Sequence, residues 1–486
     1  MTFARSRWVR IGAPLLVVLL ALAAVLAVTV LGRPSADRGG RLADELRDAV
    51  RIEAIMDDLA ELQEIADRHG GMRAAGTQGY LASASYVASQ LRDAGYLVEL
   101  DTFDVPLFSE VGSGTVEVGD QRFEAGTDFR PMIFSPSGEL IARVVAVGYR
   151  AGVEPGTQVP GAGCDAADFA AVPPRVILLV QGGPCASRDI VDNAAAADAA
   201  ALVVANTSWE PGTVRRPTLR TPDVTIPVLG VSRQMGDALH DAAEGEVAVH
   251  LSFQTAIVDQ PAANVIAETP GGDPAHVIML GGHLDSVIDG PGINDNGSGS
   301  MAVLEIARQL ATRQPQHKVR VAFWAAEEIG LYGSFRYVSS LVFEERRAID
   351  VYLNFDMLGS PNGGRFVYDP QQAATGTATV TEAFVSYLAS AGLGSEALDL
   401  GAASDHFAFQ QGGVPIGGLF SGGGAILDSD AAERFGRGSV GEPYDPCIHL
   451  ACDRLDNVDP VLLEEMVRAA AYVTGTFASG EVVVRE

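Results

Sequence analysis

The chain has 486 residues, of which 47% are hydrophobic and 20% charged, and its formal net charge is -28. This length exceeds one ordinary hydrophobic core, so two domains and an appendage are expected, and the apolar content excludes a disordered chain. The negative charge repels phosphate backbones, which excludes nucleic acid as a partner and favours high solubility.

Residues 1–33 combine basic charge with a long apolar run. Three arginines, the last of them Arg10, precede an uncharged stretch over residues 11–32. This order is typical of an export signal, with the basic flank in the cytoplasm and the rest of the chain outside. The run is almost long enough to span a membrane, and neither a clear cleavage site nor a lipobox cysteine follows it. A cleaved signal peptide and an uncleaved anchor both remain open, and the protein is expected to be secreted or held at the outer face of the cytoplasmic membrane.

The four cysteines fall into two local pairs, Cys164 with Cys185 and Cys447 with Cys452. An even number of cysteines in an exported chain predicts disulfides. Zinc binding by these thiols is the weaker alternative, because no CxxC spacing occurs.

The first part of the larger domain is expected over residues 41–125. Apolar residues recur at helical spacing over 42–69 and end at a glycine pair. A glycine-rich loop, a helix over about 80–94 and a strand over 97–103 follow.

The residue composition changes between residues 126 and 258, where prolines and glycines cluster between short valine-rich runs. Strands are expected at 176–180 and 201–205, with an alanine-rich helix at 189–200 between them. The stretch contains no convincing catalytic set, so we interpret 126–258 as an inserted β-rich domain.

Strands and helices alternate through residues 259–480. The expected elements are strands at 277–281, 319–324 and 351–355, and helices at 300–311, 330–340 and 377–391. Such alternation predicts an α/β fold with a mixed, mostly parallel sheet flanked by helices. Functional sites in sheets of this kind lie at the carboxyl ends of the strands.

Acidic residues or a histidine follow each of these three strands. His283 and Asp285 follow the first strand, Glu327 and Glu328 the second, and Asp356 the third. Each has an ordinary structural alternative, such as a hydrogen-bonded strand end, a solvated helix start or a helix cap. The coincidence on three strands favours a shared site.

Two further residues complete a metal-binding set. Asp295 lies at the turn into a helix, and His449 lies on the loop between the last two cysteines. Two imidazoles and three carboxylates suit a pair of zinc-like ions with one bridging carboxylate. One glutamate of the Glu-Glu pair can then bind metal while the other acts as general base. Asp285 is expected to orient the ring of His283.

The remaining histidines outside this pattern have no comparable context. We interpret them as surface or structural residues: His69, His240, His250, His276 and His317.

With these residues in view, the chain resembles the co-catalytic zinc aminopeptidases of peptidase family M28, in particular the secreted bacterial leucine-type enzymes. The resemblance covers most of residues 42–103 and 262–477. Its motifs occur in the family order: "GGMRAAGTQGY", "GGHLDSV", "AAEEIGLYGS", "NFDMLGSPN", "SDHFAFQQGGVPIGGLFSG" and "CIHLACD". It implies a zinc-peptidase-like α/β/α sandwich.

The resemblance also implies a role for each site residue. His283 and Asp356 would bind one zinc ion, Glu328 and His449 the other, with Asp295 bridging them. Glu327 would be the general base, and Met357 and Phe420 would form an apolar pocket for the first side chain of the substrate, although Phe420 has plain core as its alternative. An acidic surface also permits a calcium site, for which no ligands can be named.

The insert resembles a protease-associated (PA) domain through "GCDAADFA", "LLVQGGPC" and "IPVLGVS". The resemblance implies a lid or recognition surface rather than a catalytic part, and it supports the pairing of Cys164 with Cys185.

Two positions depart from the family pattern. Ile448 stands where members often carry a tyrosine whose hydroxyl stabilises the oxyanion, and Ala403 stands where an arginine helps to bind the amino terminus. Loss of one oxyanion donor costs about 10²–10³ in rate. His406 is a candidate substitute, with a structural role as its alternative.

The resemblance therefore predicts an exported aminopeptidase acting on peptides or proteins with a free N-terminus, with apolar first residues preferred. The alternatives are another M28 chemistry, such as dipeptidase or carboxypeptidase-like cleavage, and a receptor-like binding protein without activity. The oligomeric state is left undetermined.

Overall fold

The computed structural model describes residues 36–152, 162–182, 185–206, 212–370, 374–482 and 484, and the predicted export segment lies outside them. Within these residues, no helix is long and apolar enough to cross a membrane. Disulfides join Cys164 to Cys185 and Cys447 to Cys452.

The larger part of the molecule is built on a mixed sheet with the strand order β13-β12-β14-β11-β9-β10-β8, and β1 pairs with the far side of β8. Strands β9, β10, β11 and β14 run parallel, whereas β8 is antiparallel to β10, and β12 is antiparallel to β14 but parallel to β13. This confirms the predicted mixed, mostly parallel sheet. The strands are β1 (Leu97–Val118), β2 (Gln121–Glu124), β8 (Ala248–Glu268), β9 (Asp273–His283), β10 (His317–Trp324), β11 (Ile349–Phe355), β12 (Phe366–Tyr368), β13 (Glu396–Leu398) and β14 (Ile416–Phe420).

Helices cover both faces of this sheet. Alternate residues of each strand point to opposite faces, so Leu280 packs with α3, α4, α7 and α13, whereas Met279 packs with α8 and α11. The helical elements of this part are α2 (Ala36–Ala49), α3 (Ile52–Arg68), α4 (Gln78–Asp93), η2 (Ile293–Ser298), α7 (Gly299–Leu310), α8 (Tyr332–Ser340), α9 (Phe343–Ala348), α10 (Thr377–Ser390), α11 (His406–Gln411), α12 (Ser429–Phe435), η3 (Leu455–Asn457) and α13 (Pro460–Ala478).

Two sequence expectations need correction. The helix expected over 42–69 is two helices, because Arg51 is extended and its backbone N–H donates to Glu305 Oε1 at 3.1 Å. The strand expected over 97–103 continues to Val118, because β1 pairs antiparallel with β8 along almost its whole length.

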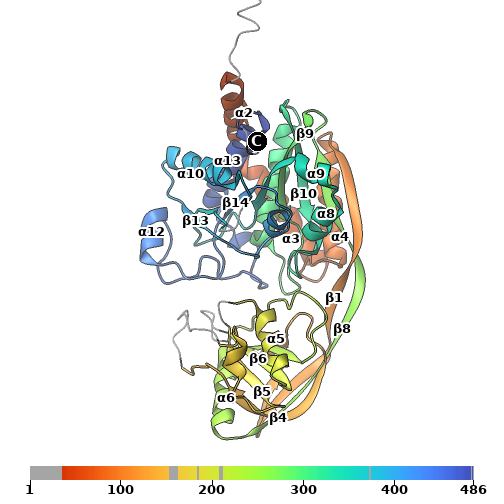
Figure 1. The fold of residues 1–486 in the computed structure, drawn as a ribbon, viewed down its shortest axis with the longest axis vertical. Helices are drawn as coiled ribbons and strands as arrows, with labels where there is room; N and C mark the ends of the chain where they lie inside the picture. Colours follow the sequence, from red (N-terminus) through yellow and green to blue (C-terminus); the bar gives the residue numbers. More distant parts are fainter. Residues whose placement is uncertain are drawn as a thin grey trace, which may run out of the picture.

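The inserted part consists of short strands and two helices. Strands β4, β5, β6 and β7 are parallel and β3 is antiparallel to β7. Its elements are β3 (Phe129–Pro131), β4 (Gly138–Ala146), η1 (Ala166–Phe169), β5 (Ile177–Gln181), α5 (Ser187–Ala196), β6 (Ala201–Ala205), β7 (Val228–Val231) and α6 (Arg233–Glu244). Figure 1 shows that the long pair β1 and β8 runs from the larger part into this one, so one continuous ribbon joins them.

Candidate metal centre

Three parallel strands bring the predicted ligands to one edge of the sheet. His283 is the last residue of β9 and lies beside Trp324, the last residue of β10. Asp356 follows the end of β11, and Glu328 lies four positions after Trp324. Because the strands run in the same direction, their carboxyl ends meet at this edge.

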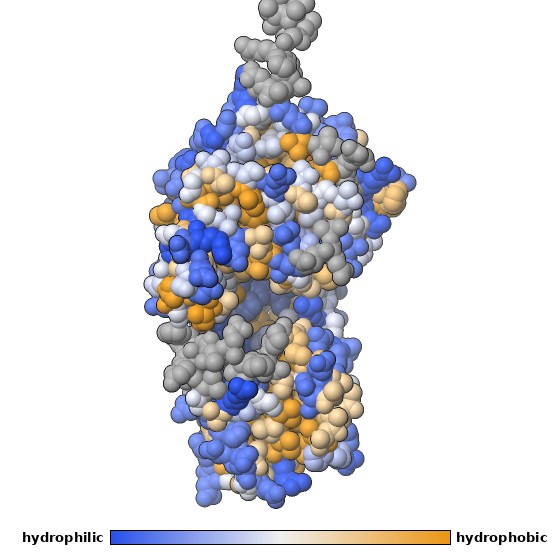
Figure 2. Space-filling view, turned by 60° about the vertical axis from the view of Figure 1, so that its left-hand side comes forward, coloured by the Kyte–Doolittle hydropathy of each residue, from blue (hydrophilic) through white to orange (hydrophobic). Residues whose placement is uncertain are grey.

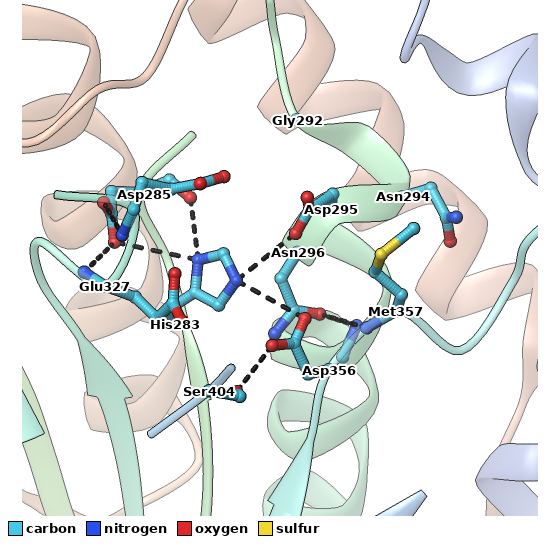
Figure 3. Close-up of polar contacts among 12 residues, drawn as sticks. His283, Asp285, Gly292, Asn294, Asp295, Asn296, Glu327, Asp356, Met357 and Ser404 are labelled. Atoms are coloured by element: carbon cyan, nitrogen blue, oxygen red, sulfur yellow. Dashed lines mark hydrogen bonds and ion pairs between the residues drawn. The ribbon is translucent and has the colours of Figure 1, made fainter. Parts of the chain in front are cut away.

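The predicted ligands form two groups that share Asp295. In the first group, His283 Nε2 lies 3.3 Å from Asp295 Oδ1 and 3.4 Å from Asp356 Oδ1 (Figure 3). In the second, His449 Nε2 lies 3.0 Å from Asp295 Oδ2 and 3.2 Å from Glu328 Oε2. The two oxygens of Asp295 thus face different histidines.

These distances fit two divalent ions. Two ligands about 2.1 Å from a tetrahedral zinc ion lie about 3.4 Å apart, close to the separations seen here. Within each group, all three ligand atoms lie within 4.8 Å of one another. In addition, Glu328 Oε1 is buried and has no hydrogen-bond partner among the described residues. A buried carboxylate oxygen of this kind is suited to bind a metal ion.

The loop that carries Asp295 is held by a second buried acid. Asp453 accepts hydrogen bonds from the backbone N–H groups of Asn294 and Asp295, both at 2.9 Å. Asn294 in turn donates to Asp445 Oδ2 at 2.6 Å. Asp445 and Asp453 lie on either side of the Cys447–Cys452 loop, so the segment of Asp295 and the His449 loop are joined by hydrogen bonds.

Asn296 attaches the same loop to the end of β11. Its Nδ2 donates to the carbonyl of Phe355 at 2.9 Å, and its Oδ1 accepts from the N–H groups of Gly299 and Met357 (Figure 3). A Cβ atom at Gly299 would lie 2.2 Å from the Phe355 carbonyl oxygen. Only glycine permits this close approach.

Asp285 supports the neighbouring strand. Its carboxylate accepts from the backbone N–H groups of Glu327 at 3.2 Å and Glu328 at 3.3 Å. The ring of His283 is oriented mainly by the main-chain oxygen of Asp285, 3.1 Å from Nδ1, while the carboxylate lies 3.7 Å away. The sequence predicted that Asp285 contacts His283, but not that its carboxylate binds the backbone N–H groups of Glu327 and Glu328.

Comparison with known proteins identifies the family of the chain and of its insert. Peptidase family M28 matches residues 264–474, and the PA domain matches residues 141–239. The chain is 37% identical over 438 residues to an aminopeptidase of Pseudomonas aeruginosa, covering 88% of this chain and 81% of that protein. It is 38% identical over 449 residues to the probable lipoprotein aminopeptidase LpqL of Mycobacterium tuberculosis, covering 89% and 86%.

The chain belongs to peptidase family M28. A solved aminopeptidase from Aneurinibacillus sp. strain AM-1 shares its fold, with a TM-score of 0.68 over 89% of this chain and 94% of that one, at 23% identity. The zinc-peptidase-like fold and the inserted PA domain predicted from the sequence are thereby confirmed.

Two further residues of this M28 chain support the site, although the sequence analysis gave them no role. Ser404 Oγ donates to Asp356 Oδ2 at 2.5 Å and accepts from Asn354 Nδ2 at 2.8 Å. The buried guanidinium of Arg73 donates to the carbonyls of Leu284, Pro291 and Gly292, so it joins the two ends of the loop between β9 and η2. The only sequence signal was their place inside the "SDH" and "GGMRAAG" motifs.

The backbone is strained at three points of the site. Ala326, Met357 and His449 have positive φ angles of 61, 56 and 60°. Residues with a Cβ atom rarely adopt this conformation, and it persists where surrounding contacts hold it. All three positions are adjacent to, or are themselves, residues of the predicted metal and base set.

Burial and charge act in opposite directions on the acids. Burial raises the pKa of Glu327 and of Glu328 above that of an exposed glutamate. Burial acts in the same direction on Asp295, but hydrogen bonds from His283 and His449 outweigh it and lower the pKa of that carboxyl. Asp295 therefore favours the ionised form, while Glu327 has a raised affinity for a proton.

The site opens into a cleft of about 570 Å³ between the catalytic and inserted parts. Figure 2 shows the surface hollowed between them. Met357, Phe420, Ile448 and Ala403 line the cleft, as do residues of the PA domain including Arg215. Phe420 also packs against Phe366, so it belongs to both the cleft and the core.

Arg215 links the PA domain to the loop of His449. Its guanidinium donates to the carbonyl of Ile448 at 2.8 Å and to that of Pro446 at 3.4 Å. The Cys447–Cys452 disulfide closes the same loop. The insert therefore contacts the residue directly before a predicted metal ligand.

His406 lies behind the cleft rather than in it. Its Nε2 donates to the carbonyl of Gly401 at 3.0 Å, its ring packs edge-on against Tyr368, and burial lowers its pKa to about 4. His406 therefore has a packing role. It does not replace the polar groups that the family pattern places at Ile448 and Ala403, which line the cleft.

Proposed function

We propose that this M28 peptidase is an exported aminopeptidase that uses two zinc ions to hydrolyse the N-terminal peptide bond of peptides, releasing apolar residues such as leucine. The observation that carries the proposal is the placement of Asp295, whose two oxygens face His283 and His449 at 3.3 and 3.0 Å. Each half of the site then has one histidine, one acid of its own and one shared acid.

His283 and Asp356 would hold one ion, Glu328 and His449 the other, and Asp295 both. When bound, such a pair of ions polarises the scissile carbonyl and lowers the pKa of the attacking water. Ser404 holds the second oxygen of Asp356, which leaves Oδ1 facing His283, where it would bind the ion.

Glu327 is proposed as the general base. It accepts a proton from the attacking water and passes it to the leaving amine as the peptide bond breaks. The raised pKa that burial gives Glu327 suits this exchange, because the group must hold the proton briefly. Its backbone N–H donates to Asp285, so the main chain that carries this carboxylate is held at the edge of the cleft.

The lining of the cleft supports an apolar first residue. Met357, Phe420 and Ile448 offer hydrocarbon surface near the predicted ligands, and apolar pockets favour side chains such as leucine. The PA domain forms the opposite wall, so the cleft is suited to a chain end rather than to the middle of a folded protein.

Export is supported by the basic and apolar N-terminal residues and by the lipoprotein named among the relatives. All four cysteines of this chain form the two internal disulfides, so secretion or an uncleaved anchor is proposed rather than a lipid on cysteine.

The decisive experiment compares hydrolysis of leucine p-nitroanilide with that of its N-acetylated twin, each with and without a chelator. Cleavage of the free-amine compound alone, lost on chelation and restored by zinc, is the expected result. Cleavage of the acetylated compound would indicate another M28 chemistry. No cleavage of either compound would favour a binding role. The two departures from the family pattern, Ile448 and Ala403, would then be the first candidates for the cause of the missing activity.

A further inference from the structure

A second group of metal-binding side chains lies at the amino ends of the strands that carry the catalytic site. His276 is in β9, His317 is the first residue of β10, and Asp350 is the second residue of β11. One ligand atom from each lies within 4.8 Å of the other two. Strand β10 has 8 residues, so this group is roughly 20 Å from the catalytic centre.

Both irregularities in strand pairing here fall on members of the group. Ile349 and Val351 pair with consecutive residues of β9, so Asp350 is an extra residue in β11. On the other side of β9, the partners of His317 and Lys318 are Asp273 and Val277, so His276 lies in the unpaired stretch between them. Bulges of this kind redirect side chains and are frequent beside functional sites.

The three side chains converge on one carboxylate oxygen. Asp350 Oδ2 lies 2.9 Å from His276 Nδ1 and 3.8 Å from His317 Nδ1. The two imidazoles are stacked, with ring centroids 4.9 Å apart and planes 20° apart, and both direct Nδ1 toward Asp350 Oδ2.

An ordinary ion pair does not account for His317. The hydrogen bond between His276 and Asp350 satisfies those two residues, yet His317 Nδ1 is buried and has no hydrogen-bond partner among the described residues. The opposite side of that ring is closed by the C-terminal segment, because a Cβ atom at Gly480 would lie 2.9 Å from His317 Nε2. A buried nitrogen without a partner, facing a carboxylate and a second imidazole, is placed to bind a water molecule or a metal ion.

We propose that His276, His317 and Asp350 bind a third divalent transition-metal ion, of which Zn²⁺ is the reference. Two imidazole nitrogens and one carboxylate oxygen form a ligand set common for zinc, cobalt and nickel. The side chain of His276 is 50% exposed, so a water molecule can complete the coordination from solvent.

The bound ion would join the amino ends of β9, β10 and β11, whose carboxyl ends present the catalytic residues. Because it binds the folded chain and these ligands separate on unfolding, the ion stabilises the fold. It takes no part in hydrolysis, so this inference stands or falls separately from the proposed aminopeptidase activity.

The test titrates Zn²⁺ by calorimetry into purified protein whose catalytic centre is already saturated with zinc. The wild type should bind one further equivalent and unfold at a higher temperature when it does. His276→Ala and Asp350→Asn should each weaken this binding at least about 10-fold and abolish the thermal shift. His276 is half exposed, so its variant is expected to fold, and leucine anilide hydrolysis should stay unchanged as a check.

His250→Ala is the matched control. This histidine also has two acidic neighbours, but Glu139 faces Nε2 and Glu117 faces Nδ1, so the carboxylates do not converge on one ion. Its loss should leave the further equivalent in place. Absence of that equivalent in the wild type, or equal binding by wild type, His276→Ala and Asp350→Asn, would overturn the proposal.

Discussion

The two ends of strands β9, β10 and β11 each carry a group of side chains for which metal binding is proposed, but the structure supports the two groups differently. At the carboxyl ends, each of three ligand regions has an outside partner: Asp453 for Asp295, Ser404 for Asp356 and Asp285 for the Glu327–Glu328 backbone. At the amino ends, the contacts described above join His276, His317 and Asp350 to one another.

This contrast in supporting contacts is what we expect between a catalytic metal centre and a group that only binds an ion. Partners outside the ligand set fix the direction of each ligand and tune its charge, and their loss typically costs 10- to 100-fold in affinity or activity. A site that only holds an ion tolerates looser geometry. We therefore expect substitutions at the carboxyl ends to affect hydrolysis and those at the amino ends to affect ion content alone.

The largest effect is expected from Glu327→Gln. The amide cannot accept a proton, so kcat should fall by about 10²–10⁴-fold or more. The zinc content should stay at the wild-type value, because Glu327 is not among the proposed ligands. Steady-state kinetics and elemental analysis measure the two quantities, with Glu344→Gln on the exposed helix α9 as control. Near-normal turnover would remove Glu327 as the base.

A smaller loss is expected from Asp285→Asn. An asparagine side chain offers one acceptor oxygen, so one of the two backbone N–H groups of Glu327 and Glu328 loses its partner. We expect kcat to fall about 10- to 100-fold. The same change at the other end of the strands, Asp350→Asn, should leave kcat within about two-fold. Similar losses in both variants would contradict the division between the two ends.

Arg215→Met tests whether the PA domain supports the metal centre. The variant keeps much of the side-chain volume but loses the hydrogen bonds to the carbonyls of Ile448 and Pro446. Since the loop of His449 is then less restrained, one zinc ion should be lost at an about 10-fold lower chelator concentration. Arg122→Met, on the exposed strand β2 of the ribbon, is the control. Unchanged retention of both ions would show that the disulfide alone holds this loop.

The smallest effect concerns His250, whose pKa is raised by the hydrogen bond with Glu139 and further by Glu117. A raised folded-state pKa means that the native chain binds the proton more tightly than the unfolded chain. The resulting stability is present below the ordinary value of 6.5 and is lost as the pH rises through the folded-state pKa. Wild type should thus exceed His250→Gln in melting temperature only on the acidic side, by a small amount because the pair is exposed.

Proton NMR of the His250 ring adds a contrast with the amino-end group. Added Zn²⁺ should leave the titration of His250 unchanged, because its two carboxylates face opposite nitrogens. A titration shifted by zinc would show that acidic neighbours alone suffice for zinc binding. The convergence of His276 and His317 on one carboxylate oxygen would then no longer distinguish the amino-end group.

Much of the catalytic end could be predicted from local sequence. An apolar run of strand length followed within four residues by His283, Glu328 or Asp356 identifies both the strand and the polar residue near its end. Parallel strands place their carboxyl ends together, so three local patterns converge without any knowledge of side-chain packing. The mixed sheet, its helices and the inserted domain followed from similar patterns.

The break at Arg51 and the length of β1 could not be predicted in this way. Helical spacing continues across Arg51, and only its contact with Glu305, 254 positions away, shows where the helix ends. The extent of β1 depends on pairing with β8, which begins 130 residues after β1 ends.

Local sequence specifies which residues stand near the ends of strands, because hydrophobic runs and their polar boundaries are local. Which side chains meet depends on the folded chain, as for Arg215 with Ile448 and for His317 with Asp350. The cause is strand register: pairing between strands, including the shifts at His276 and Asp350, depends on neighbours that no single segment specifies.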